Sequence, residues 1–491
     1  MKIHEMSARE LASALTAGEV SAVEVTQAFF DRIDAVDDQV GAYLTLMRET
    51  ALQQAEEADA RRKRDDDVPP LLGVPIALKD NLCTNGVRTT CASKMLEQFV
   101  PPYDATVVTR LKEAGMPILG KTNMDEFALG SSTEYSALKK TRNPWNLERV
   151  PGGSSGGSAA AVSASLAPFA LGTDTGGSIR QPAAYCGIVG MKPTYGLVSR
   201  FGLVAAAPSL DQIGTMTKDV ADTALLLNVI AGYDPYDSTS VNREVPDYFA
   251  SLETDVSTLR FGMPAEFFSA DIHPEVRTAV ESAIKRLEAL GAEVVEVNLP
   301  HSTYALSAYY VIASGELSSS LGRYDGVRYG HRADVEGDVF TMFRHSRSEG
   351  FGPEVKRRIL LGTYVLLSGN YRDYYLQAMK VRALIAKDFE QAFEQCDVIV
   401  APAAANVAFP FDGVVDPAEM HALDLFTVPV NLAGLPAISL PCGLNSEGMP
   451  IGLQLIGPAF GEVQLLQAAY ALEQEIGPLP KQPQLEVKSN D

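Results

Sequence analysis

The chain has 491 residues, of which 46% are hydrophobic and 21% are charged. These proportions are typical of a globular protein and exclude a disordered tail, a collagen-like fibre and a mini-protein. Its 41 basic and 62 acidic residues give a net charge of −21 at pH 7. Because a polyanion is repelled by phosphate backbones, unaided binding of DNA or RNA is not expected.

The cysteines are few and scattered, with no Cys-x-x-Cys pair or Cys/His cluster, so neither a disulfide framework nor a zinc site is predicted. The N-terminal segment carries charges throughout and lacks the apolar region of a signal peptide. The most apolar run, Ala159 to Gly172, is interrupted by serines and a proline and is too short to cross a bilayer. We expect a reduced, cytoplasmic protein that holds no metal and has no membrane segment.

Two amphipathic helices are predicted to open the chain. Ser7 with Glu10 and Ser21 with Glu24 have the spacing of capping boxes, which mark helix starts. The basic run Arg61–Arg64 precedes three aspartates. This change of sign favours a solvated helix end over a nucleic-acid site.

Strand-like and helical patterns alternate from residue 71 onward. Buried strands are predicted at 71–78, 116–119 and 168–171, and helices at 105–114 and 157–166. Apolar residues at helical spacing from Val276 to Leu290 are followed by a strand at 294–297. This alternation predicts an α/β fold with a largely buried sheet. Residues 303–395 are predicted to be mostly helical, as an insertion or a cap over the sheet.

Two glycine-serine stretches are the main chemical signal: Pro151–Ser158 and Gly172–Ser178. Each lies between a non-helical segment and a predicted helix start. Glycines let several backbone N–H groups point at one place, and a helix N-terminus reinforces their positive potential. A serine in such a loop sits beside a potential oxyanion site, although flexible loops or a phosphate cradle have the same composition.

Lys79 directly follows the apolar run Leu71–Leu78. Burial at a strand end lowers the pKa of a lysine and makes the amine a possible base near neutral pH. The alternative is a lysine that reaches the surface or pairs with Asp80.

Three other patterns are weaker. Gly115–Thr122 has the spacing of an ATP-binding P-loop, but its centre is apolar and strand-like, whereas phosphates need a polar glycine-rich loop. Gly152–Gly156 has the spacing of a nucleophile elbow, but the preceding Asn143–Arg149 is polar and turn-like. Cys186, a possible nucleophile, is predicted to be a buried core residue. The six histidines lie far in sequence from both glycine-serine stretches.

Lys79, the GGSSGGS stretch that contains Ser154 and the GTDTGGSIRQPAA stretch that contains Ser178 together resemble the amidase signature family. The resemblance covers nearly the whole chain. It implies one α/β domain over residues 1–491, with a central mixed sheet covered by helices on both faces. It also implies a catalytic triad in which Ser178 is the nucleophile, Ser154, after a cis peptide bond, relays its proton, and Lys79 is the general base.

The same resemblance assigns further roles around Ser178. Backbone N–H groups of Thr175, Gly176, Gly177 and Ser178 are expected to form the oxyanion hole. Asp174 and Gln181 are expected to support the Ser178 loop rather than to act as catalysts.

Four further stretches are similar to one branch of that family, the A subunits of glutamyl-tRNA(Gln) amidotransferases. They are Gly120–Phe127, Arg323–Gly330, Glu354–Arg358 and Asp424–Asn431. This branch hydrolyses glutamine, whose α-carboxylate and α-ammonium need a cation and an anion in the pocket. By family position Arg358 is expected to bind the carboxylate, with Arg357 as the alternative, and Asp424 the ammonium, with Tyr309 nearby.

The branch also implies partners in a heterotrimer. The B subunit would use the released ammonia, with ATP and Mg²⁺, to convert Glu-tRNA(Gln) to Gln-tRNA(Gln), and the small C subunit would aid assembly. No cofactor is expected in this chain. The alternatives are a stand-alone amidase acting on aryl, fatty or small aliphatic amides, and a non-catalytic scaffold.

Overall fold

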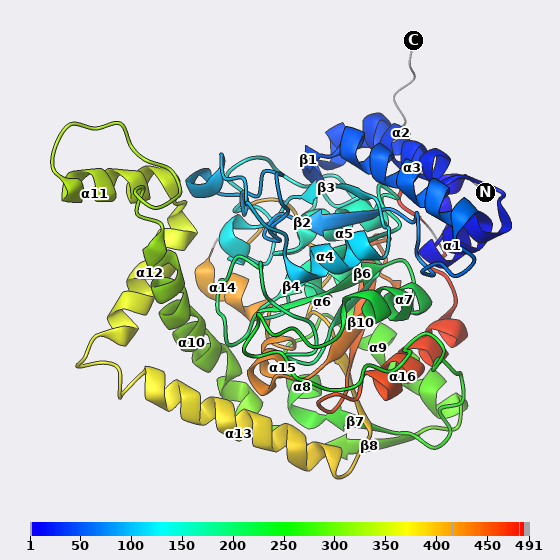
Figure 1. Cartoon of the computed structure of the whole chain (residues 1–491). Coiled ribbons are helices and arrows are strands. Elements are labelled where there is room, and N and C mark those ends of the chain that lie inside the picture. Colours follow the sequence, from blue (N-terminus) through cyan, green and yellow to red (C-terminus); the bar gives the residue numbers. More distant parts are fainter. Residues whose placement is uncertain (1, 415, 481, 486–491) are drawn as a thin grey trace.

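The computed structural model describes residues 2–414, 416–480 and 482–485. Among these residues one sheet of eleven strands has the order β1-β3-β2-β4-β6-β5-β10-β11-β9-β7-β8 (Figure 1). In chain order the strands are β1 (Tyr43–Leu46), β2 (Ile76–Lys79), β3 (Ile118–Thr122), β4 (Phe169–Asp174), β5 (Val189–Lys192), β6 (Gln212–Thr217), β7 (Arg260–Pro264), β8 (Glu293–Val297), β9 (Val398–Pro402), β10 (Ala437–Leu444) and β11 (Pro450–Ile456). Strands β3, β2 and β4 run parallel, as do β9, β7 and β8, and the other pairs are antiparallel. The sheet is therefore mixed, as predicted.

Helices cover both faces of this sheet. Every residue of β4, β6 and β11 is buried, and because successive side chains point to opposite faces, continuous burial requires cover on each side. In the first half of the chain the helices are α1 (Ala8–Ala17), α2 (Ala22–Val40), α3 (Arg48–Arg64), α4 (Thr106–Glu113), α5 (Gly156–Ser163), α6 (Arg180–Cys186) and α7 (Val220–Ile230). The second half holds α8 (Ala265–Ser269), α9 (Pro274–Ala289), α10 (Ala305–Ser320), α11 (Val339–Gly350), α12 (Pro353–Leu366), α13 (Tyr375–Phe393), α14 (Pro417–Ala422), α15 (Val428–Ala433) and α16 (Glu462–Ile476).

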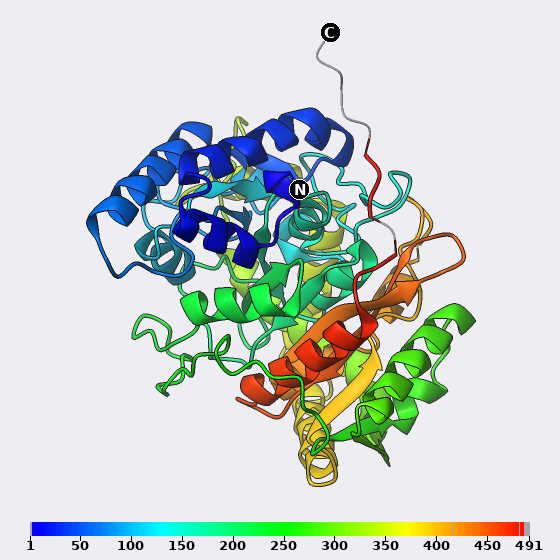
Figure 2. The same ribbon diagram turned by 90° about the vertical axis from the view of Figure 1, so that its right-hand side faces the viewer.

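The N-terminal helices begin where the sequence predicts. Both capping boxes form, at the starts of α1 and α2. The basic run Arg61–Arg64 ends α3, and Arg64 pairs with Asp65 in the following loop. Figure 2 shows α1–α3, in blue, gathered together at one end of the molecule.

One strand differs from its prediction. The strand predicted at 71–78 begins only at Ile76, and Pro70–Gly73 form a turn. Gly73 has a positive φ of +81° and its N–H donates to the Gly115 carbonyl. The apolar run is buried as predicted, but its first part packs as a turn, because burial alone does not distinguish the two.

The stretch 303–395 contains α10–α13 and no strand. Figure 1 shows α11, α12 and the connection between α12 and α13 at the outer edge of the molecule, beyond the sheet. None of the helices that the structure describes combines the length and the apolar character needed to span a bilayer.

Two neighbouring strands bring the sequence motifs together. Strands β2 and β4 are adjacent and parallel, so Lys79, at the end of β2, lies at the same sheet edge as the loop that follows β4. Carboxyl ends of parallel strands are the usual place for a site in α/β proteins.

Candidate active site

Lys79 is fully buried at the end of β2. Burial lowers the pKa of its amine to about 7, against the opposing charges of Asp125, Asp174 and Asp211. Its Nζ donates to Ser154 Oγ at 2.8 Å, to Ser155 Oγ at 2.8 Å and to the Thr173 carbonyl at 3.4 Å. A lysine of this kind is substantially neutral at physiological pH, which a base requires.

The loop before α5 places two serines on Lys79. Ser154 follows a cis Gly153–Ser154 peptide bond, as the resemblance predicts. Ser155 Oγ donates to the Thr173 carbonyl at 3.0 Å, so it acts as an acceptor toward Lys79. A neutral lysine that donates its two hydrogens to Ser155 Oγ and the Thr173 carbonyl keeps its lone pair for Ser154.

Asp174 organises the loop that carries Ser178. Its carboxylate accepts hydrogen bonds from the Gly177 N–H (2.8 Å), the Ile179 N–H (3.1 Å) and the Arg180 guanidinium. Burial by itself would raise the pKa of Asp174, but the charge and hydrogen bonds of Arg180 outweigh burial and hold that pKa at about 2. Asp174 is therefore an anion that fixes the turn, in the supporting role expected of it.

This turn requires glycine at two positions. Gly177 has a φ of +135°, and a Cβ there would lie 2.2 Å from Thr427 Oγ1. A Cβ on Gly176 would lie 2.8 Å from the Tyr309 ring. Without side chains, these residues bring the backbone beside Ser178 close to both neighbours.

The oxyanion hole differs from its prediction at one residue. The Gly177 N–H, expected to face the oxyanion, donates instead to Asp174, because the turn folds around that carboxylate. Thr175, Gly176 and Ser178 stay as the predicted donors. Among the described residues no hydrogen bond joins Ser178 Oγ to Ser154 Oγ, so this link of the predicted relay is not closed here; catalytic hydrogen bonds are often long before substrate binds.

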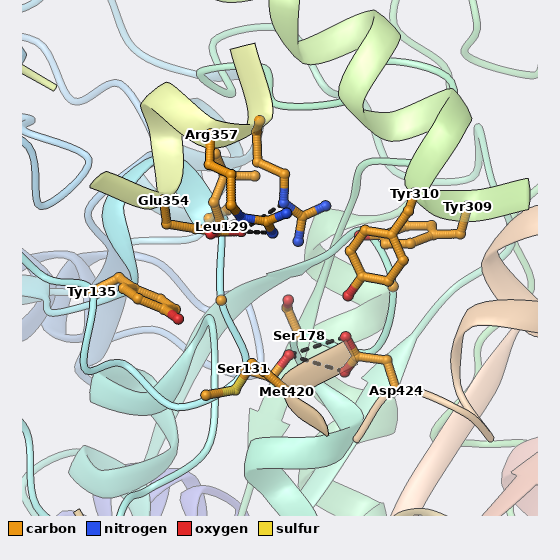
Figure 3. A pocket seen from close by; sticks show the side chains of 14 residues that line it. Leu129, Ser131, Tyr135, Ser178, Tyr309, Tyr310, Glu354, Arg357, Met420 and Asp424 are labelled. Carbon is orange, nitrogen blue, oxygen red and sulfur yellow. Dashed lines mark hydrogen bonds and ion pairs between the residues drawn. The ribbon is translucent and has the colours of Figure 1, made fainter. Parts of the chain in front are cut away.

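A pocket opens beside Ser178 (Figure 3). Figure 3 shows Glu354 and Arg357 on one side of it and Ser131 and Asp424 on the other, with Ser178 between them. Its lining places charged groups of opposite sign on opposite walls.

The cationic wall comes from α12. Arg358 is 6% exposed, donates through Nε to Glu354 Oε1 at 2.7 Å and lies over the Tyr310 ring at 4.3 Å. Arg357 makes two 2.7 Å hydrogen bonds to the same carboxylate and is more exposed. Both predicted candidates therefore line the pocket, and Arg358 is the more deeply buried.

The anionic wall is Asp424. Ser131 Oγ lies 3.1 Å and 3.0 Å from its two carboxylate oxygens. Burial raises the pKa of Asp424 to about 7, in spite of the Ser131 hydroxyl and the charge of Arg358, which both lower it. A cation bound here would stabilise the carboxylate. The Tyr309 ring lines the pocket between Gly176 and Asp424.

Gln181 connects the two loops of the site. Its Oε1 accepts from the Gly153 N–H and its Nε2 donates to the Ser131 carbonyl, both at 3.0 Å. Its side chain therefore supports the loops of Gly153 and Ser131, whereas the resemblance predicted support of the Ser178 loop.

The other motifs found in the sequence have structural positions and do not form a second site. Lys121, the lysine of the P-loop-like stretch, lies inside β3, where it is fully buried and bonds to Thr89 Oγ1 at 3.0 Å. Residues 143–149 form turns rather than a strand, and Cys186 is buried. No histidine whose side chain is described lines the pocket.

Four contributing residues were not identified from the sequence: Ser131, Ser155, Tyr310 and Glu354. Glu354 lies in a stretch singled out only for its resemblance, and Ser155 adjoins a predicted catalytic serine. Neither Ser131 nor Tyr310 carries a local signal, because each acquires its role from a residue far away in the chain.

The arrangement can perform acyl transfer. It combines a buried amine of lowered pKa, a serine hydrogen-bonded to that amine, and a second serine in a turn rich in backbone N–H groups beside a charged pocket. These features define a serine hydrolase that cleaves amides.

Comparisons with known proteins give the same class. A family model described as Amidase matches residues 24–466, and the chain belongs to this family. The A subunit of the glutamyl-tRNA(Gln) amidotransferase of Moorella thermoacetica is 58% identical, over 99% of this chain and 100% of its own. The crystal structure of the corresponding A subunit from Thermotoga maritima is 42% identical with a TM-score of 0.82, covering 100% of this chain and 99% of that one. Peptide amidase from Stenotrophomonas maltophilia is 32% identical with a TM-score of 0.84, covering 98% and 99%.

Proposed function

We propose that this chain is the glutamine-hydrolysing subunit of a glutamyl-tRNA(Gln) amidotransferase. The observation that carries the proposal is the pair of opposite charges, Arg358 and Asp424, on opposite walls of the pocket that contains Ser178. The names of the full-length relatives support it. Arg358 would bind the α-carboxylate of glutamine and Asp424 its α-ammonium, which directs the side-chain amide toward Ser178.

The reaction would begin with proton transfer away from Ser178. Ser154 takes this proton while passing its own to the neutral Lys79, and Ser178 Oγ attacks the amide carbon. Backbone N–H groups of Thr175, Gly176 and Ser178 would stabilise the oxyanion. The proton then returns to the leaving nitrogen, ammonia departs, and water hydrolyses the glutamyl-Ser178 ester through the same groups.

The remaining chemistry would belong to partner subunits. The B subunit would use ATP and Mg²⁺ to activate the glutamate on tRNA(Gln) and accept the ammonia, and the C subunit would aid assembly. Hydrolysis requires no cofactor in this chain. The net charge of −21 fits a subunit that leaves tRNA to its partner, and the function implies a cytoplasmic location.

The alternative is a stand-alone amidase with the same nucleophile. An aryl, fatty or small aliphatic amide would use neither Arg358 nor Asp424, and it would supply no positive charge to the buried Asp424 carboxylate, which is costly to bury unpaired. The pocket therefore favours an amino acid over an apolar amide.

Ammonia release from L-glutamine tests the proposal. Wild type and Ser178→Ala are each co-expressed with the B and C subunits, and ammonia is measured at saturating glutamine. We expect release by the wild type and none above background by the variant. A well-assembled wild-type complex that releases ammonia from simple amides but not from glutamine would support the stand-alone amidase instead.

A further inference from the structure

Exposed apolar side chains gather along the end of α12, the turns that follow it and the start of α13, a part of the chain that lies at the outer edge of the molecule (Figure 1). Of the 21 large hydrophobic side chains exposed among the described residues, eight fall within residues 360–379. These eight, which we call the hairpin patch, are Leu360, Tyr364, Leu366, Leu367, Tyr371, Tyr374, Leu376 and Met379. Single exposed apolar residues are ordinary, but a cluster of this kind marks an interaction site.

The second half of α12, from Ile359 onward, has the composition of a helix that is covered on both sides. The inner face of α12, including Val355 and Val365, is buried, yet Leu360 is 70% exposed and Tyr364 49% exposed. No charged residue occurs from 359 to 371. Because surface helices normally turn polar residues outward, a helix that is apolar on both faces indicates a second packing partner.

The surroundings of the hairpin patch are cationic in an acidic protein. Residues 359–387 contain four basic residues, the last of them Lys387, and one acidic residue, Asp373, against 41 and 62 in the whole chain. Arg372, Lys380 and Lys387 are exposed. The complementary surface is therefore apolar with an acidic border. A twofold dimer through this patch would bring two cationic borders together, which disfavours a second copy of this chain.

The side chains of the hairpin patch favour a protein over a nucleic acid. Five of the eight are aliphatic or thioether groups, which do not stack on bases. Two of its three tyrosines, Tyr364 and Tyr374, pack against each other with ring centroids 5.7 Å apart, and Tyr371 stacks on Tyr375 at 5.4 Å. Their rings are therefore already engaged within this part of the chain.

We propose that the hairpin patch docks the ammonia-accepting subunit, through an apolar surface bordered by carboxylates. The proposal rests on the proposed function. Helix α12 carries Glu354 and Arg358 on the pocket wall and Leu360 and Tyr364 in the patch, so a protein docked on this helix lies against the wall of the glutamine pocket. Ammonia that passes between subunits requires such proximity, since release into solvent would dilute it.

The test is a pair of charges placed in the hairpin patch. The double variant Leu360→Glu/Leu376→Glu is co-expressed with the B and C subunits of the same organism, beside the control Val100→Glu, whose exposed valine lies outside the patch. We expect the affinity for the other subunits to fall at least about a hundredfold in the double variant, because two charges would be buried in an apolar interface. The control should bind within about twofold of wild type. Light scattering gives the assembly state and a titration gives Kd.

Thermal unfolding of each isolated chain controls for folding, and the milder pair Leu360→Ser/Leu376→Ser should weaken binding in the same direction. A double variant that assembles like the wild type overturns the docking proposal and leaves the proposed function intact. A wild-type chain that never assembles with these subunits overturns both. A wild-type homodimer that the double variant dissociates, or tRNA binding lost while subunit binding persists, would assign the patch to another occupant and overturn the proposal.

Discussion

The sheet edge and the helical region contribute different parts of the site. At the ends of β2 and β4, Lys79 and the Ser178 turn are buried and held by many short-range hydrogen bonds. The binding groups come from distant elements, Arg358 from α12 and Asp424 from the segment before α15, and meet only across the pocket. The ends of β2 and β4 thus provide the reactive groups, and α12 and the segment before α15 provide the binding groups. Substitutions at the strand ends should therefore change mainly kcat, and substitutions of the binding groups should change mainly KM.

Removing the nucleophile should give the largest effect. Ser178→Ala should lower kcat for glutamine hydrolysis at least about a thousandfold, because it removes the hydroxyl that lies between the oxyanion donors and the pocket. Calorimetry should find glutamine bound within a few-fold of the wild-type affinity. Appreciable turnover in this variant would show that Ser178 is not the nucleophile.

Lys79→Ala should be nearly as severe as the loss of Ser178. The base and the nucleophile act as one unit, so the double variant should be no slower than Ser178→Ala alone. Steady-state rates of the wild type, the two single variants and the double variant complete a double-mutant cycle. Additive losses would mean that Lys79 acts independently of Ser178.

The pH dependence should separate the two regions. Lys79 must be neutral and Asp424 charged, and each pKa is about 7, so activity requires both groups to be deprotonated and falls as the pH drops below 7. At pH 6 the kcat/KM for glutamine should be about a hundredfold below its plateau, and in Asp424→Asn only about tenfold below that variant's own plateau. Identical slopes in the two proteins would contradict a titrating Asp424.

At constant pH near the plateau, Asp424→Asn should act mainly on KM. Loss of a charge-assisted hydrogen bond to the α-ammonium should raise the KM for glutamine about tenfold or more, with a smaller change in kcat. A primary amide without an α-ammonium is the control substrate, and its kcat/KM should not fall. An equal loss on both substrates would place Asp424 in the chemistry rather than in selectivity.

Ser131→Ala should give the smallest effect. Ser131 holds the Asp424 carboxylate, so its loss should raise the KM for glutamine about fivefold, equivalent to about 1 kcal/mol, and shift the acidic limb of kcat/KM to higher pH. Replacement by threonine, which keeps the hydroxyl, should restore both. A variant with unchanged KM and unchanged pH profile would show that Ser131 does not position Asp424.

The sheet-edge chemistry was predictable from the sequence because its residues lie in short local patterns. Lys79 ends an apolar run, and each predicted serine lies in a glycine-rich stretch before a helix. Those local features survive folding almost unchanged. The helical character of residues 303–395 was equally local.

The contacts between regions were not predictable. The hydrogen bond from Ser131 to Asp424 joins residues 293 positions apart, and only the packed fold makes them neighbours. The Gly177 N–H was misassigned for a related reason, because the direction of an amide within a turn depends on the carboxylate around which that turn folds. Reactive residues can therefore be predicted from sequence patterns more easily than the residues that hold them in place.

The amide of Gln181 has a consequence for redesign. Because it joins the Gly153 N–H to the Ser131 carbonyl, the loop that determines selectivity and the loop that carries the proton relay form one mechanical unit. Grafting the segment around Ser131 from an amidase with another preference would displace Gly153 and, with it, Ser154. An exchange of substrate preference should therefore succeed only when both loops and the bridging glutamine are inherited together as one module.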